Sequence, residues 1–185
     1  MSTEKQVAAQ TRKWVQEIVM HHNFCPFAHK PFRNDTIRYS VCMADEPEGV
    51  VETFIEELLT LRDGNREELE TTILVTPNCF AKFEDYNQFL DIADELIEQL
   101  HLEGQIQVAS FHPDYQFADL ELDDVRNYTN RSLYPTFHLI LEDSIDEARE
   151  SYPDVHVIPE NNMKLLAEMG LEEAQRQLAA CREVE

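Results

Sequence analysis

The sequence predicts an α/β protein of α+β sandwich character, in which helices cover a mixed sheet of four to five strands. Segments whose apolar residues recur at helical spacing alternate along the chain with segments whose apolar residues recur at every second position. The composition is 43% apolar over 185 residues, which is enough for one compact core without disulfide bonds.

The first part of the chain predicts a helix followed by a strand. The helix ends near His22, and its apolar residues share one stripe: Val7, Trp14, Val15, Ile18 and Val19. Pro26 favours an extended conformation at Cys25. Residues 36–43 alternate as a strand does, with two faces that carry Ile37, Tyr39, Val41 and Met43 on one side and Arg38, Ser40 and Cys42 on the other.

The middle of the chain predicts two longer helices around a buried strand. Residues 47–64 indicate a helix, because proline suits its first turn and glycine its end. The short apolar run at 72–76 is typical of a central strand that is covered on both faces. Asp85 and Gln88 resemble a capping box and place the start of the next helix, which extends over 85–104.

Two further strands enclose a long segment without regular structure. Residues 105–111 and 135–141 have the apolar pattern of strands. Between them, residues 112–134 show no strong period. A segment of this length in a compact domain is typically functional, disordered, or built around a short helix, which we place at 123–128.

The last part of the chain predicts small elements. A capping-box signal at Ser144 opens a short helix, residues 155–158 form a final edge strand, and 159–170 form another helix. We expect 1–170 to make one domain, with 171–185 as a peripheral C-terminal helix or tail. The element order favours parallel strand pairs, with helices either on one face, as in a ferredoxin-like sandwich, or on both.

Charge and composition exclude several classes of partner. The chain has 15 basic and 37 acidic residues, a net charge of −22, so it repels nucleic-acid phosphate and anionic lipid. No apolar run reaches the roughly 20 residues of a spanning helix, and the first ten residues lack the features of a signal peptide. We therefore expect a cytoplasmic protein without a nucleic-acid or membrane partner, whose four cysteines are free thiols.

Three polar segments carry the candidate chemistry, and the first is Asn23–Ala28. Cys25 follows a helix C-terminus, whose dipole raises the pKa of a thiol, so it needs a neighbouring His or Arg to become a nucleophile. The alternative is a small buried apolar side chain in a tight turn. We name Cys25 as a candidate catalytic residue and Asn23 as a candidate ligand contact.

The second segment begins with His112, directly after a strand. Ligands of open α/β sheets collect beyond the carboxyl ends of strands, and a His there can exchange a proton near neutral pH. The alternative is a His that caps the strand through a backbone hydrogen bond. His138, on the following strand, is the third candidate catalytic residue.

The third segment, residues 127–132, contains a cation among amides and hydroxyls. Arg131 can hold a carboxylate or phosphate in a bidentate fork, oriented by Asn127 and Asn130. Arg38 is placed to join it. The alternative is an ion pair between Arg131 and an acid of the same loop, namely Asp119, Glu121, Asp123 or Asp124.

Metal and nucleotide sites are not predicted. His21, His22 and Cys25 are suitable zinc ligands, but adjacent helical histidines diverge by about 100° and no second ligand pair follows. The P-loop, GxGxxG, GxSxG and HExxH signatures are absent from the sequence. The sequence does not identify a cofactor.

Several motifs together resemble a bacterial family of about this length, catalogued as domain of unknown function 1415. They span roughly residues 11–170 and comprise Trp14-Val15, Asn23–Ala28, Phe111-His112-Pro113, Asn127–Ser132, Tyr134-Pro135, His138 and Ile158–Asn161. The resemblance implies no activity. Members of the family carry Gly-Leu in place of His21-His22 and Pro in place of Leu133.

Two functions follow from these residues. The first is an enzyme that acts on a small anionic substrate, with Arg131 as anchor and His112, Cys25 and His138 as catalytic groups. The second is a non-catalytic module that binds a small anion, or a basic protein attracted by the acidic surface. Both require the three segments to meet in space. If they do not, their polar groups serve only loop structure and packing.

Overall fold

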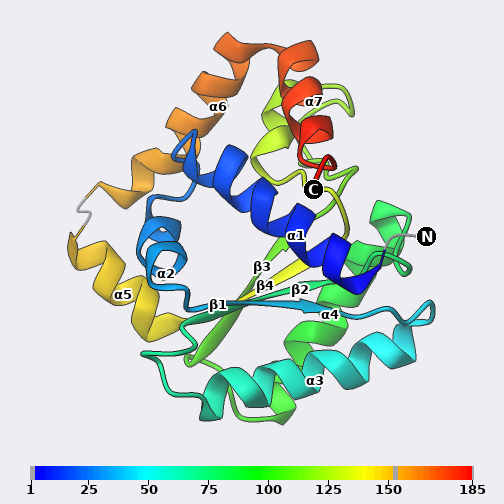
Figure 1. Cartoon of the computed structure of the whole chain (residues 1–185), viewed down its shortest axis with the longest axis vertical. Helices are drawn as coiled ribbons and strands as arrows, with labels where there is room; N and C mark the ends of the chain where they lie inside the picture. Colours follow the sequence, from blue (N-terminus) through cyan, green and yellow to red (C-terminus); the bar gives the residue numbers. More distant parts are fainter. Residues whose placement is uncertain (1–2, 152–153, 185) are drawn as a thin grey trace.

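A four-stranded sheet lies between two layers of helices in the computed structural model, which describes residues 3–151 and 154–184 (Figure 1). The strands are β1 (Ile37–Val41), β2 (Thr71–Val75), β3 (Ile106–Phe111) and β4 (Thr136–Leu141). The α-helices are α1 (Glu4–Trp14), α2 (His29–Asn34), α3 (Pro47–Asp63), α4 (Phe83–Gln99), α5 (Glu142–Ser151), α6 (Ile158–Met169) and α7 (Leu171–Ala180). A π-helix, η1 (Val15–Met20), continues α1, and 3₁₀ turns lie at η2 (Pro26–Ala28), η3 (Val125–Thr129) and η4 (Val155–Val157).

The sheet is mixed, with strand order β1-β2-β4-β3. β1 and β2 are parallel, and β4 is antiparallel to both β2 and β3. The carboxyl ends of β1, β2 and β3 therefore lie at one edge. The predicted α/β class with a mixed sheet is confirmed. Helices cover both faces, so the one-faced ferredoxin-like alternative is not the observed arrangement.

The first core lies between the sheet and the helices α3 and α4 (Figure 1). Phe54, Phe89 and Phe137 form its centre, with ring centroids 5.2 to 5.9 Å apart. The buried Tyr86 hydroxyl donates to the backbone oxygen of Thr136 at 2.6 Å and accepts the Phe111 N–H at 3.2 Å. This hydroxyl therefore ties α4 to the carboxyl end of β3.

The second core lies on the opposite face, between the sheet and α1, η1, α6 and α7. Trp14 packs edge-to-face on Phe111 at 5.3 Å. Ala174 and Cys181 are buried in the same cluster, and Gln10 donates to the backbone oxygen of Arg182. The segment predicted as a peripheral C-terminal helix or tail therefore packs into the second core over its described residues, 171–184. Residue 185 lies outside the described residues.

Three local predictions differ from the structure. The predicted edge strand at residues 155–158 is a 3₁₀ turn that leads into α6, because Pro159 suits the first turn of a helix. The helix predicted from a capping box at Asp85 begins at Phe83, and α5 begins at Glu142, directly after β4. The six-residue α2 was not predicted, because it is too short to show a period. Among the described residues, no helix has the length and apolar character needed to cross a membrane.

Candidate functional site

The π-helix η1 shapes the site from the N-terminal side. The His21 N–H bonds the Gln16 carbonyl at 3.2 Å, and the Phe24 N–H bonds the Val19 carbonyl at 2.9 Å, so both bonds span five residues. Such turns insert one extra residue into a helix and recur at functional sites. Asn23 ends the segment with φ +55°. The chain therefore turns sharply after His22 and presents Phe24 to the C-terminal helices.

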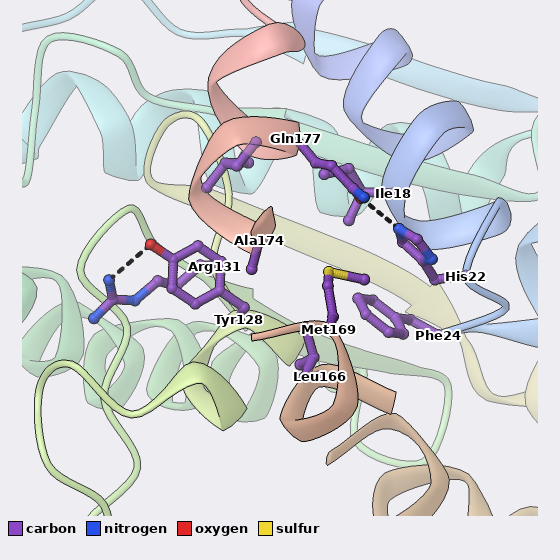
Figure 2. A pocket seen from close by; sticks show the side chains of 10 residues that line it. Ile18, His22, Phe24, Tyr128, Arg131, Leu166, Met169, Ala174 and Gln177 are labelled. Carbon is purple, nitrogen blue, oxygen red and sulfur yellow. Dashed lines mark hydrogen bonds between the residues drawn. The ribbon is translucent and has the colours of Figure 1, made fainter. Parts of the chain in front are cut away.

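A small hollow of about 10 Å³, partly open to solvent, lies between η1, η3, α6 and α7. Its lining consists of Ile18, His22, Phe24, Tyr128, Arg131, Leu166, Met169, Ala174, Gln177 and Leu178. Figure 2 shows apolar side chains in its middle and a polar pair at each end. One pair is Arg131 with Tyr128, and the other is His22 with Gln177, whose Oε1 lies 2.6 Å from the imidazole Nε2.

Arg131 is held by the loop that it belongs to. Its Nε donates to the Tyr115 carbonyl at 3.2 Å and its Nη2 to the Leu122 carbonyl at 2.6 Å. The guanidinium carbon lies 4.9 Å from the centre of the Tyr128 ring, and Nη1 lies 3.5 Å from the hydroxyl. Carbonyls and a ring orient the cation but do not neutralise it, and two of its five N–H groups stay available.

No carboxylate of the described residues lies within ion-pairing distance of Arg131. Asp124, one of the acids considered as its partner, is bound instead by Arg126 through contacts of 2.9 and 2.6 Å. This bidentate pair lowers the pKa of Asp124 to about 2. The positive charge of Arg131 is therefore uncompensated by a local acid, although the chain is strongly acidic.

Asn127 and Asn130 build the loop that carries Arg131. The fully buried Asn127 accepts the Phe117 N–H at 3.1 Å and donates to the Glu121 carbonyl at 2.8 Å. Asn130 donates from Nδ2 to the Ser110 carbonyl at 3.0 Å. Both amides satisfy backbone groups, as asparagines in irregular segments commonly do. They position the cation and do not line the hollow.

His112 meets the same loop through its backbone, since its N–H bonds the Asn130 carbonyl at 3.1 Å. Its side chain is fully buried with both nitrogens bound: Nε2 donates to the Phe80 carbonyl at 2.9 Å, and Nδ1 accepts the Asp114 N–H at 3.0 Å. Burial lowers the pKa of His112, and the nearby charge of Arg131 lowers it further. This is the strand-capping arrangement, with a neutral imidazole.

Arg38 and His138 lie on opposite faces of the sheet. Arg38 faces α3 and donates to the buried Glu57 from Nε at 2.7 Å and Nη2 at 3.0 Å, so a carboxylate already occupies its fork. His138 shares the face of the second core with its register partner Ile73. Its Nε2 donates to Thr71 Oγ1 at 2.8 Å, and burial lowers its pKa to about 4. Neither residue lines the hollow.

Cys25 stands next to the site but does not line it. Its backbone is extended, at φ −130° and ψ 95°, as Pro26 predicts. Burial raises the pKa of the thiol, and the N–H groups of Phe27 and Ala28 partly oppose this. The direction agrees with the sequence analysis, but the cause is desolvation. Asn23, which is exposed, approaches His29 Nε2 at 3.3 Å and contributes the positive φ.

No cluster suited to a metal ion is found in the described part of the chain. Within residues 3–151 and 154–184, no three His, Cys, Asp or Glu side chains gather closely enough to hold one. The rings of His21 and His22 meet edge to face, with their centroids 4.9 Å apart. His22 turns to Gln177 in the hollow, and His21 is exposed.

The family model described as a protein of unknown function (DUF1415) matches residues 6–176. The chain belongs to the DUF1415 family. This confirms the resemblance carried by its motifs. No curated protein and no solved structure matches the chain. The match to DUF1415 extends into α7, the helix that closes the hollow on the C-terminal side.

The polar segments of this DUF1415 protein converge only in part. The second and third segments form one hydrogen-bonded loop, and the first reaches the hollow through Phe24, whose carbonyl accepts from Asn162 Nδ2 at 2.8 Å. Sequence reasoning missed Tyr128, Met169 and Gln177 as parts of the site. Their apolar or amide character gives no functional signal before the C-terminal helices are placed.

Proposed function

We propose that this chain is a binding module for a small organic anion with an apolar body, held in the hollow between η1 and the C-terminal helices. The observation that carries the proposal is Arg131, which is among the residues that line an apolar hollow and has no carboxylate partner among the described residues. A ligand carboxylate or phosphate would supply the missing charge. Its body would contact Phe24, Leu166 and Met169.

The surroundings of the other candidates favour binding over catalysis. Both nitrogens of His112 are bound by backbone groups, and the fork of Arg38 is filled by Glu57. A nucleophilic Cys25 would need an activating base, yet burial keeps its pKa raised. A proton carrier and a nucleophile within reach of one another are the minimum of an acyl- or phosphoryl-transfer site. The hollow brings together neither Cys25 nor His112 nor His138.

The size of the hollow limits the ligand. Sites for drug-sized molecules enclose about 300–1,000 Å³, whereas this hollow encloses about 10 Å³, room for about one water molecule. A ligand of one ring or a short aliphatic chain therefore fits only when the side chains that line the hollow move apart. His22 and Gln177 line the end of the hollow opposite Arg131, where the amide of Gln177 holds the imidazole in one orientation.

The test uses matched pairs of small ligands on the full chain. Benzoate and hexanoate are titrated beside benzyl alcohol and hexanol, which share the apolar body but lack the charge. The readout is methyl NMR with ¹³C-labelled methionine, because Met169 lines the hollow and a Met169→Leu variant assigns its signal. We expect the Met169 methyl signal to shift in a saturable manner with a carboxylate, and the alcohols to bind at least about tenfold more weakly.

Arg131→Met is expected to abolish the preference for the acid over the alcohol. Arg33→Met is the matched control, since it removes the same charge from an exposed site on α2. Because Arg131 also supports its loop, Arg131→Lys provides a second variant that retains the charge and loses the fork. Equal affinity of acids and alcohols for the wild-type chain, or no change in the Met169 signal with any of them, contradicts the proposal.

A further inference from the structure

A second hollow lies on the other side of Gln177, between the N-terminal helix and α7. It encloses about 220 Å³ and is open to solvent. One wall is formed by the N-terminal helix, which contributes Lys13, Glu17 and His21 at intervals of four residues. The helix α7 forms the opposite wall. The polar and thiol side chains of the lining are Lys13, Glu17, His21, Arg176, Gln177 and Cys181. We define this as the α1–α7 hollow.

Charges of both signs face the α1–α7 hollow. Lys13 donates from Nζ to the carbonyls of Ala180 at 3.1 Å and Glu183 at 2.7 Å, which fixes the ammonium against the end of α7. One of its three N–H groups stays available. The Glu17 carboxylate is exposed and makes no hydrogen bond or ion pair with the described residues. Cys181, whose side chain is buried, lines the same hollow.

We propose that the α1–α7 hollow binds a small zwitterion, of the class of a free α-amino acid. The carboxylate of the ligand would pair with Lys13, and its ammonium would pair with Glu17. Arg176 is bound to Glu173 by contacts of 2.8 and 2.5 Å and is not required. A simple anion is less suited, because the Glu17 carboxylate at this hollow repels it locally, whereas a zwitterion has no net charge to be repelled.

This site is separate from the one proposed for an organic anion. Gln177 is the shared wall: its Oε1 bonds His22 in the first hollow, and its Nε2 donates to Glu173 at 2.7 Å. The two sites therefore have different charges, since Arg131 serves the first and Lys13 with Glu17 the second. They also have different reporter methyl groups, Met169 and Ala180.

The experiment titrates the full chain, labelled with ¹³C at alanine methyl groups, with the twenty common L-amino acids. Each amino acid that binds is compared with its N-acetyl derivative, which lacks the ammonium, and its amide, which lacks the carboxylate. An Ala180→Ser variant assigns the reporter signal. We expect at least one free amino acid to shift the Ala180 signal in a saturable manner, and both derivatives to bind at least about tenfold more weakly.

Glu17→Gln should weaken binding of that amino acid by about tenfold, without affecting the fold because Glu17 makes no hydrogen bond. Glu172→Gln, an exposed acid on α7, is the matched control and should bind as the wild type does. Arg131→Met should also leave it unchanged, which separates this site from the first. The proposal is overturned if no amino acid shifts the Ala180 signal, if an N-acetyl derivative binds equally well, or if Glu17→Gln has no effect.

Discussion

Acid should destabilise this protein through His138. Burial lowers the pKa of His138 to about 4 in the folded chain, against about 6.5 in the unfolded chain. Between these values the unfolded state binds one more proton than the folded state. The contribution of His138 to the free energy of unfolding is therefore fully present above about pH 6.5 and is lost as the pH falls towards 4. At 1.36 kcal/mol for each pH unit, the loss is limited to about 3.4 kcal/mol, and about 2.5 kcal/mol of it is reached at pH 4.5.

Urea unfolding of the wild type and of His138→Gln at pH 4.5, 5.5, 6.5 and 7.5 measures this contribution. Glutamine keeps a donor for Thr71 Oγ1, which accepts from His138 Nε2 at 2.8 Å, and removes the titration. All other titrating groups are shared, so the difference between the two proteins isolates His138. The difference should change by about 2.5 kcal/mol between pH 7.5 and pH 4.5, in favour of the variant in acid. Parallel pH profiles would refute the reasoning.

Four further changes have defined outcomes. Asn127→Ala removes the partners of three backbone groups and should lower the free energy of unfolding in urea by about 2–3 kcal/mol. Arg38→Met should cost about 2–3 kcal/mol, because the buried Glu57 carboxylate would keep the Ser40 hydroxyl as a donor but lose its counter-charge, and adding Glu57→Gln should restore most of the loss, as a double-mutant cycle would measure. His101→Gly should raise the melting temperature, because His101 has φ +57° after α4, a left-handed conformation that costs an L residue about 1–2 kcal/mol and that glycine adopts freely. Cys25 should react with iodoacetamide at pH 7.5 at least about tenfold more slowly than a cysteine peptide, by mass spectrometry, because burial raises its pKa.

The faces of the sheet could be predicted because a strand alternates without exception. Tyr39 lies with the second core and Cys42 with the first, as the alternation of residues 36–43 indicates. The short apolar run that became β2 is buried at every position, which requires helices on both sides of the sheet. The apolar pattern was therefore sufficient to predict the layers and the central strands. It left open which strands are neighbours, because that depends on contacts between distant segments.

The errors arose where local signals have two meanings. Residues 155–158, three of which are apolar, suit an edge strand or the entry to an amphipathic helix, and the proline that follows favours the helix. A cation in a polar loop suits a ligand site or an ion pair. Arg131 is neither paired with an acid nor free in solvent, because its guanidinium donates to the backbone carbonyls of Tyr115 and Leu122. Only the folded loop could show this third arrangement.

Two backbone irregularities explain why the first hollow could not be foreseen. The π-helix leaves the apolar spacing of the first helix intact while it changes the direction in which His22 leaves, so periodicity carries no trace of it. Gly170, at φ +83°, ends α6 and begins α7, which lets Met169 and Ala174 face one space. A side chain at that φ would strain the backbone, although no atom lies near enough to clash with it. The hollow is therefore set by the backbone at its two ends, and the polar loop carrying Arg131 closes a space that the helices have already made.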